Sequence, residues 1–258
     1  MSWSARRSYS NRSEAGNRTI EYFVFTPRTA NANQTGMPLF CWLHGYGDSI
    51  RAASPFKVLD DGSAPWFTLR PQAPIASNWG LGRFPGSGSG RLPRSWQAVA
   101  PLRLLVALLD YLSSSLPVDA TRIAMGGVSM GAYATWDLLV RNLGRFVVAV
   151  PIAGGGDPSC GRLLNGTSIW AWHGLHDKTV PVRASQDMVA AVARARGMEL
   201  KNVSACGGWR GCKMMRAPDD RLRHTELEAA HFGAERYAMN QASLVEWVAH
   251  RLGVVLAR

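Results

Sequence analysis

The chain has 258 residues, of which 47% are hydrophobic and 18% are charged, so it can bury a full core. This composition excludes an intrinsically disordered protein and a miniprotein held together by disulfides. The 29 lysine and arginine residues exceed the 18 acidic residues by 11. The arginines are scattered and no nucleic-acid-binding motif accompanies them, so we expect a basic surface and no nucleic-acid partner.

Residues 1–18 are polar and rich in Arg, Ser and Asn, which predicts a flexible N-terminal arm ahead of a single folded domain at 19–258. The arm lacks the apolar segment of a signal peptide, and no apolar run reaches the roughly 18 residues of a membrane span. We therefore expect no transmembrane segment and, by default, a cytoplasmic protein. Secretion stays open, because five glycosylation sequons begin at Asn11, Asn17, Asn33, Asn165 and Asn202.

Short β-branched, aromatic or apolar runs predict strands, and leucines at helical spacing predict helices between several of them. Strands that alternate with helices are typical of an α/β fold with a mostly parallel central sheet and helices on both faces. Two Gly-rich stretches, 76–95 and 205–222, are predicted to be loops. Strands are expected at 20–26, 38–43, 66–69, 122–125, 146–152, 168–172 and 224–228, and helices at 98–115, 132–143, 183–196 and 241–252.

A Gly-x-Ser-x-Gly pattern, Gly127-Val-Ser-Met-Gly131, lies between a predicted strand and a predicted helix. Small residues on both sides of the serine permit a tight turn that holds its Oγ clear of the backbone. We therefore predict Ser129 as a nucleophile. The alternative is a purely structural Gly/Ser turn.

A serine nucleophile needs a base, and the base needs an acid that orients it; in this motif's usual context the order along the chain is Ser, acid, His. Asp177 follows the predicted strand 168–172, and His231 follows the strand 224–228. Both residues are expected at strand ends, where they can converge on Ser129. The sequence therefore predicts Asp177 as the acid and His231 as the base.

Other candidates for these roles remain. Asp157 is the main rival acid and His224 the rival base. His173 and His176 flank Asp177 and are expected to shape its loop. A metal site made by His173, His176 and Asp177 would match no established ligand spacing, and we expect neither a metal nor another cofactor.

An acyl-transfer site also needs backbone N–H donors for the oxyanion of its tetrahedral intermediate. One is expected from Met130, which follows the nucleophile at the start of a helix. The other is expected from the segment Leu43-His-Gly-Tyr-Gly-Asp48, at the end of a predicted strand.

The four cysteines are too few for a disulfide framework, and their spacing fits no zinc signature. Cys206 and Cys212 are close enough in sequence to close a small loop. Whether they form a disulfide stays open, because the redox compartment is unknown.

These motifs, with Pro71-Gln-Ala-Pro74, Pro151-Ile-Ala-Gly-Gly-Gly-Asp157 and Trp172-His-Gly-Leu-His-Asp177, resemble the α/β-hydrolase superfamily. Within it the chain is similar to the dienelactone-hydrolase-like and phospholipase/carboxylesterase group, which includes esterases, depolymerases and peptidases. The resemblance implies a Ser129, Asp177 and His231 triad, with the N–H groups of Tyr46 and Met130 as the oxyanion hole. It implies a cofactor-independent serine esterase that acts on small-molecule or polymer-derived esters.

The chain departs from its relatives near the expected substrate pocket. Relatives often have an acidic or amide residue and then a Trp shortly after the catalytic His, whereas here Phe232 and Gly233 follow. The segment 205–222 looks like an insertion, and its basic residues raise the question of an acidic substrate. Trp79 is a candidate pocket wall. The basic residues in and beside the insertion are Arg210, Lys213, Arg216, Arg221 and Arg223.

The alternatives to an esterase are a peptidase or amidase with the same triad and a binding protein without catalysis.

Overall fold

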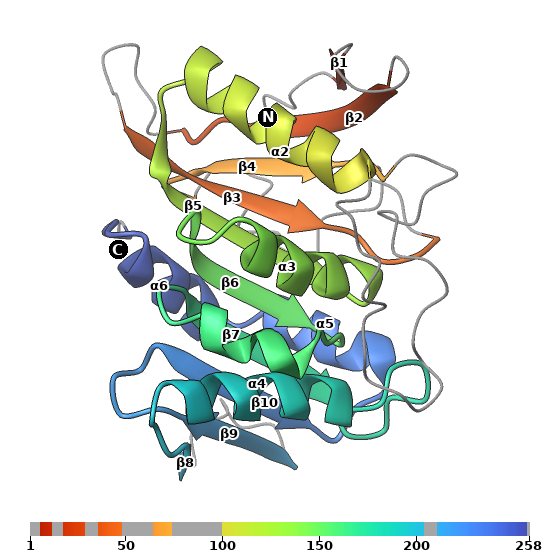
Figure 1. Ribbon diagram of the computed structural model, residues 1–258, viewed down its shortest axis with the longest axis vertical. Coiled ribbons are helices and arrows are strands. Elements are labelled where there is room, and N and C mark those ends of the chain that lie inside the picture. Colours follow the sequence, from red (N-terminus) through yellow and green to blue (C-terminus); the bar gives the residue numbers. More distant parts are fainter. Residues whose placement is uncertain are drawn as a thin grey trace.

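A computed structural model describes residues 6–11, 18–28, 36–47, 64–73, 100–203 and 211–256. The described strands form one sheet in the order β1-β2-β4-β3-β5-β6-β7-β10-β9-β8 (Figure 1). Strands from both ends of the described chain therefore share one sheet. The strands are β1 (Arg7–Asn11), β2 (Arg18–Phe25), β3 (Met37–Leu43), β4 (Phe67–Pro71), β5 (Val118–Val128), β6 (Phe146–Ile152), β7 (Ser168–Gly174), β8 (Lys201–Val203), β9 (Cys212–Arg216) and β10 (Leu222–Leu227).

The six strands from β4 through β3, β5, β6 and β7 to β10 are parallel, and β2 and β9 pair antiparallel at the two ends of this block. Parallel strands need crossover connections, which helices usually supply. The carboxyl ends of the six strands lie along the same edge of the sheet, where ligands bind in open α/β sheets. The segments that follow β3, β5, β7 and β10 therefore meet at that edge.

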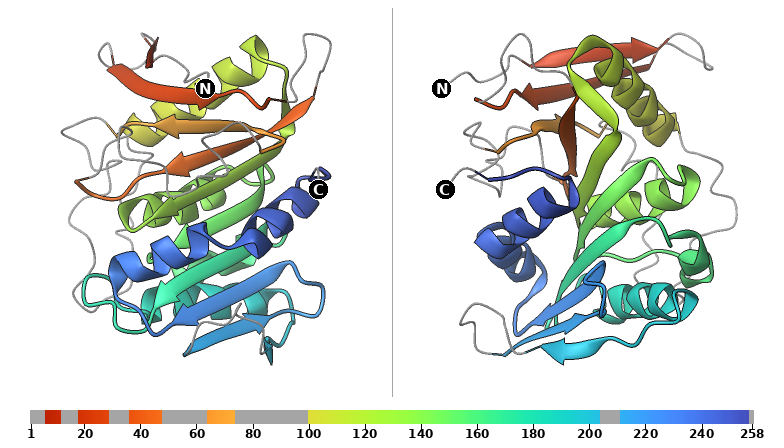
Figure 2. Two further views of the ribbon diagram at one scale, coloured as in Figure 1. Left: turned by 180° about the vertical axis from the view of Figure 1, so that it is seen from behind. Right: turned by 90° about the vertical axis from the view of Figure 1, so that its left-hand side faces the viewer.

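Helices cover both faces of the sheet, as predicted (Figure 2). One face carries α2, α3 and α4, and the other carries α5 and α6 (Figures 1 and 2). The helical elements are α2 (Ala100–Ser115), α3 (Met130–Arg141), the 3₁₀ helix η2 (Pro158–Leu163), α4 (Arg183–Ala195), α5 (His231–Met239) and α6 (Ala242–Arg251). None of the helices described is long and apolar enough to cross a bilayer.

Each face of the sheet has its own hydrophobic core, because successive side chains of a strand point to opposite faces. In β3, all seven residues are buried. Leu39 and Cys41 pack in the core beneath α2, α3 and α4, whereas Phe40 and Trp42 pack in the core beneath α5 and α6. An apolar run without alternation therefore marks a central strand covered on both sides, as the sequence predicts.

Two strands lie in segments that were predicted to lack regular structure. β1 lies within the segment 1–18 predicted as an arm, and it pairs antiparallel with β2. Its half-buried Tyr9 packs against Tyr111 of α2, with ring centroids 5.3 Å apart. One aromatic residue among polar neighbours gives no alternating pattern, so only tertiary pairing reveals this strand.

The second of these strands, β9, lies within the predicted loop 205–222 and pairs antiparallel with β10. The short β8 was not predicted either, and it pairs antiparallel with β9. The only buried residue of β9 is Met214. A single buried side chain is too weak a signal for a strand, and the sheet edge supplies the missing hydrogen-bond partners. The predicted loop 76–95 lies outside the described residues.

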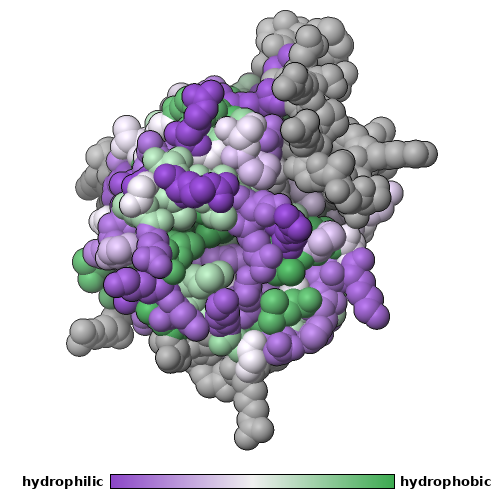
Figure 3. All heavy atoms as spheres, turned by 60° about the horizontal axis from the view of Figure 1, so that its bottom comes forward, coloured by the Kyte–Doolittle hydropathy of each residue, from purple (hydrophilic) through white to green (hydrophobic). Residues whose placement is uncertain are grey.

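The sheet edge formed by β8 and β9 comes forward in Figure 3. Hydrophilic side chains cover much of this face, and smaller apolar patches lie between them (Figure 3).

Candidate active site

Ser129 lies between the end of β5 and the first residue of α3. Its backbone is in an unusual conformation, with φ 54° and ψ −116°. A non-glycine residue with positive φ costs on the order of 1–3 kcal/mol and persists only where the surroundings impose it. The Ser129 N–H donates to the Ile152 carbonyl at 2.8 Å, which ties the turn to the end of β6. The local geometry is thus that of the strained turn predicted from the motif.

The two glycines of the motif are required by close packing. A Cβ at Gly131 would lie 2.1 Å from the carbonyl oxygen of Leu43, and one at Gly127 would lie 2.6 Å from the Gly131 carbonyl oxygen. Both distances are far below van der Waals contact. The spacing of the motif therefore lets α3 begin directly against the end of β3.

Asp177 lies in the turn after β7, and its two carboxylate oxygens have separate partners. Oδ1 accepts from the backbone N–H groups of Thr179 and Val180, both at 2.8 Å. Oδ2 lies 2.5 Å from Nδ1 of His231. The structure thus brings together the predicted acid and the predicted base.

Burial alone would raise the pKa of Asp177. Hydrogen bonds from His173 and His231 and from the Val180 N–H outweigh it and hold the pKa well below its usual range. The carboxylate is therefore ionised at neutral pH. A carboxylate on Nδ1 favours the tautomer with the proton on that nitrogen, which leaves the Nε2 lone pair available.

Backbone contacts hold the acid and base segments together. The N–H of Leu175 donates to the Leu227 carbonyl at 2.7 Å, and that of His176 donates to the Ala229 carbonyl at 3.0 Å. A Cβ at Gly174 would lie 2.3 Å from the Ala229 oxygen, so glycine is needed for this approach. These contacts fix the chain just before His231, the first residue of α5.

Ser129 lies at the same sheet edge as this pair. Tyr133, one helical turn after Ser129, has its pKa raised to about 12 by burial and by the charge of Asp177. The first turn of α3 is therefore close to the acid. Within the described residues Ser129 Oγ has no hydrogen-bond partner. In substrate-free enzymes such bonds are often long and tighten only when substrate is bound.

The predicted oxyanion-hole residues lie on either side of the contact between β3 and α3. Met130 is the first residue of α3, where backbone N–H groups have no partner within the helix. Tyr46 lies in the turn after β3 and is exposed. His44 anchors this turn, because its Nε2 accepts from the Ala73 N–H at 2.9 Å and its Nδ1 lies 2.8 Å from the Gly45 carbonyl oxygen.

Comparison with solved structures identifies the fold. A thermostable esterase matches 95% of the chain with a TM-score of 0.70 at 23% identity. The feruloyl esterase module from Clostridium thermocellum matches 96% with a TM-score of 0.61 at 13% identity, and it is itself 88% covered. The acylaminoacyl peptidase of Pyrococcus horikoshii matches 98% with a TM-score of 0.65 at 12% identity.

The chain has the α/β-hydrolase fold. It spans 62% of the length of the thermostable esterase and 42% of the peptidase. At the level of sequence, no protein-family model and no curated protein matches it.

In this hydrolase fold, the rival acid and base have other partners. Asp157 caps η2, where its Oδ1 accepts from the N–H and the hydroxyl of Ser159 at 2.9 and 2.7 Å. His224 is buried within β10, where its Nε2 lies 3.1 Å from Ser185 Oγ. Burial, followed by the proximity of His173, lowers the pKa of His224 to about 3, so it is uncharged at neutral pH.

The two histidines that flank the acid differ. His176 is exposed and contacts Glu228, whereas His173 is buried and its Nε2 lies 3.3 Å from Oδ2 of Asp177. The sequence did not distinguish them. Their different surroundings follow from β7, which ends at Gly174 and so contains His173 but not His176. Within the described residues, no group of three or more His, Cys, Asp or Glu side chains is arranged to hold a metal ion.

The predicted pocket wall Trp79 and the possible disulfide partner Cys206 lie outside the described residues. Cys212 is disulfide-bonded, and Cys41 and Cys160 are free.

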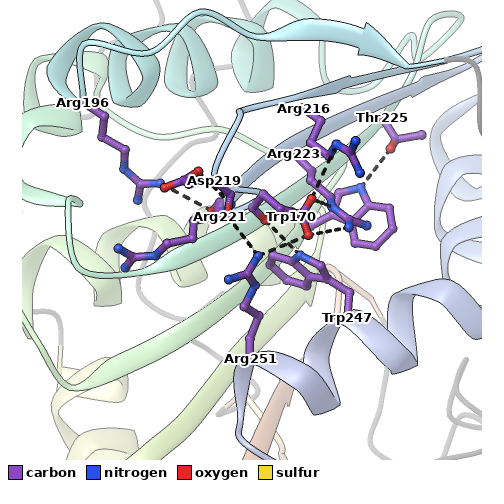
Figure 4. A network of polar contacts seen from close by, with 10 residues as sticks. Trp170, Arg196, Arg216, Asp219, Arg221, Arg223, Thr225, Trp247 and Arg251 are labelled. Carbon is purple, nitrogen blue, oxygen red and sulfur yellow. Dashed lines mark hydrogen bonds and ion pairs between the residues drawn. The ribbon is translucent and has the colours of Figure 1, made fainter.

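The arginines near the insertion lie far from the site. Arg223 lies at the start of β10, with its guanidinium 4.3 Å from the ring centroid of Trp170 and 2.6 Å from Asp220 Oδ1 (Figure 4). It pairs in register with Arg216 of β9. Arg221 donates to the carbonyl of Gly166, just before β7. These three arginines are at the amino ends of β7 and β10, so they do not line the site. Lys213 of β9 differs, because it pairs in register with Glu226 near the carboxyl end of β10. Arg210 lies outside the described residues.

Proposed function

We propose that the protein is a serine hydrolase that cleaves carboxylic esters through an acyl-enzyme on Ser129. Asp177 is the acid and His231 the base. The N–H groups of Tyr46 and Met130 form the oxyanion hole. No cofactor takes part in this chemistry.

In the first half-reaction, Ser129 Oγ attacks the ester carbonyl while Nε2 of His231 takes the hydroxyl proton. The C=O electrons move onto the oxygen, and the two backbone N–H groups stabilise that oxyanion. When the intermediate collapses, the C–O bond to the alcohol breaks and His231 returns the proton to the leaving oxygen. Water then repeats these steps on the acyl-enzyme, which releases the acid and restores Ser129.

The contact between Asp177 Oδ2 and His231 Nδ1 is the observation that supports this proposal most strongly. It joins two residues 54 positions apart in the chain, each at the end of a different parallel strand. Together with the strained turn at Ser129, it matches the roles of nucleophile, base and orienting acid. The rival acid Asp157 caps η2 instead. The rival base His224 contacts Ser185 Oγ, but both side chains are buried in the interior, away from substrate.

A peptidase or amidase is the second candidate, because the same triad can cleave amides and because acylaminoacyl peptidases share the fold. Esters are favoured here because their leaving alcohol is expelled more readily than an amine. The chain also covers most of a feruloyl esterase module, but less than half of an acylaminoacyl peptidase. We propose small-molecule or polymer-derived esters as substrates.

A panel of p-nitrophenyl esters and peptide p-nitroanilides tests the proposal. We expect ester turnover that is lost in Ser129→Ala, and slower turnover of the anilides. Faster anilide cleavage would make the protein a peptidase. Equal ester turnover by the parent and Ser129→Ala would refute the serine mechanism, and a protein that cleaves nothing and resists acylation would be a binding protein.

A further inference from the structure

The imidazole of His173 contacts Asp177 at Oδ2, the same oxygen that contacts His231. His173 belongs to β7, and its side chain is fully buried. Its Nε2 lies 2.9 Å from the carbonyl oxygen of Val180 and 3.3 Å from Oδ2 of Asp177. A carbonyl oxygen can only accept a hydrogen bond, so Nε2 of His173 carries a proton. The contact with Val180 holds this nitrogen 3.3 Å from Oδ2 of the acid.

Four groups therefore contact the carboxylate of Asp177. Two backbone N–H groups occupy Oδ1, and the imidazoles of His173 and His231 occupy Oδ2. Of these four donors, only His231 changes its protonation state during the proposed reaction. Without His173, the position of Oδ2 would depend on the base that this oxygen has to orient.

The far side of His173 is also part of the buried interior. Glu226 of β10 is its register partner, and His224, two residues earlier on the same strand, lies 3.6 Å from the Glu226 carboxylate. Glu226 in turn accepts from the amide of Gln186 at 2.7 Å. Nδ1 of His173 is buried without a hydrogen-bond partner in the described structure. Among the described residues, the polar contacts of the ring therefore face the acid and its loop.

We propose that His173 is a positioning residue for the acid: its Nε2–H fixes Oδ2 of Asp177 independently of the protonation state of His231. The proposal rests on the function proposed above. His173 is inaccessible to substrate, so its effect is on the chemical step. A catalytic group held within a fraction of an ångström depends on such supporting hydrogen bonds.

Two substitutions separate this role from simple packing. His173→Gln keeps an amide N–H at about the reach of Nε2, whereas the side chain of His173→Asn is too short to reach Asp177. We expect His173→Asn to lower kcat about 10–100-fold, the usual effect of losing a group that orients a site residue, with KM unchanged. His173→Gln should recover most of kcat. The control His176→Gln, which alters the exposed histidine directly before Asp177, should match the parent.

Equal kcat in His173→Asn and the parent, or a loss expressed in KM, would overturn the positioning role. The proposed function is judged separately, since it fails only if the parent itself neither cleaves esters nor is acylated. Should His173→Asn not fold, histidine side-chain NMR of the parent replaces it. A proton on Nε2 of His173 supports the proposal, and a proton on Nδ1 alone contradicts it.

Discussion

In Asp177→Asn, the surrounding hydrogen bonds determine how the asparagine amide is oriented and which tautomer His231 adopts. In the parent, Oδ1 accepts from the N–H groups of Thr179 and Val180. The asparagine must keep its carbonyl oxygen at that position, because its NH2 group cannot accept. The NH2 group then takes the place of Oδ2 and donates towards Nδ1 of His231. This selects the wrong tautomer, with the proton on Nε2, so the base cannot accept the proton of Ser129.

Because His231 then carries its proton on the wrong nitrogen, we expect kcat/KM of Asp177→Asn to fall about 10⁴-fold, the loss typical of a triad with the wrong histidine tautomer. That factor corresponds to about 5.4 kcal/mol of transition-state stabilisation. The assay is steady-state hydrolysis of a p-nitrophenyl ester near neutral pH. The control is Asp157→Asn, which changes the rival acid and should leave the rate unchanged. A loss below about tenfold in Asp177→Asn, or a large loss in Asp157→Asn, would refute the assignment.

Three further predictions concern stability. Ser129→Gly should unfold at a higher urea concentration, with a free energy of unfolding about 1 kcal/mol above the parent, because glycine adopts φ 54° without strain. Ser129→Ala keeps the strain and should be no more stable than the parent. Equal stabilities of the two variants would contradict this. Gly131→Ala should lower the free energy of unfolding by about 1–3 kcal/mol, because its Cβ would overlap the Leu43 carbonyl. Gly166→Ala, with open space around the Cβ, should leave the free energy of unfolding unchanged. The folded-state pKa of Asp177 lies below the unfolded value of about 3.9, so its carboxylate stabilises the fold above about pH 4, and this contribution is lost as pH falls further. The stability difference between the parent and Asp177→Asn, from urea titrations, should be constant above about pH 5 and shrink below about pH 4; a constant difference across this range would disprove the linkage.

The central part of the fold was predictable because its signals are local. Apolar runs identify β3, β6 and β7, and leucine spacing identifies α2. The predicted start of α3 is two residues late, since the strained turn places Met130 at the first helical position. The edge strands β1 and β8 and the neighbouring β9 were missed because each contributes little buried surface. Their pairing depends on neighbours that sequence alone does not bring together.

Motif and chain order predict the residues of the proposed triad, and the structure places Asp177 and His231 in contact. What the sequence could not provide is which of the neighbouring histidines meets the acid. His173 and His176 are equally polar and only three positions apart. Their burial depends on where β7 ends, a boundary that sequence patterns locate only to within a few residues.

Covalent labelling tests the central claim most directly. The parent is treated with a fluorophosphonate, and the adduct is weighed by intact-protein mass spectrometry and located by peptide mapping. We predict one adduct on the peptide that contains Ser129, and none in Ser129→Ala. An unmodified parent, or an adduct that persists in Ser129→Ala, would contradict the proposed mechanism.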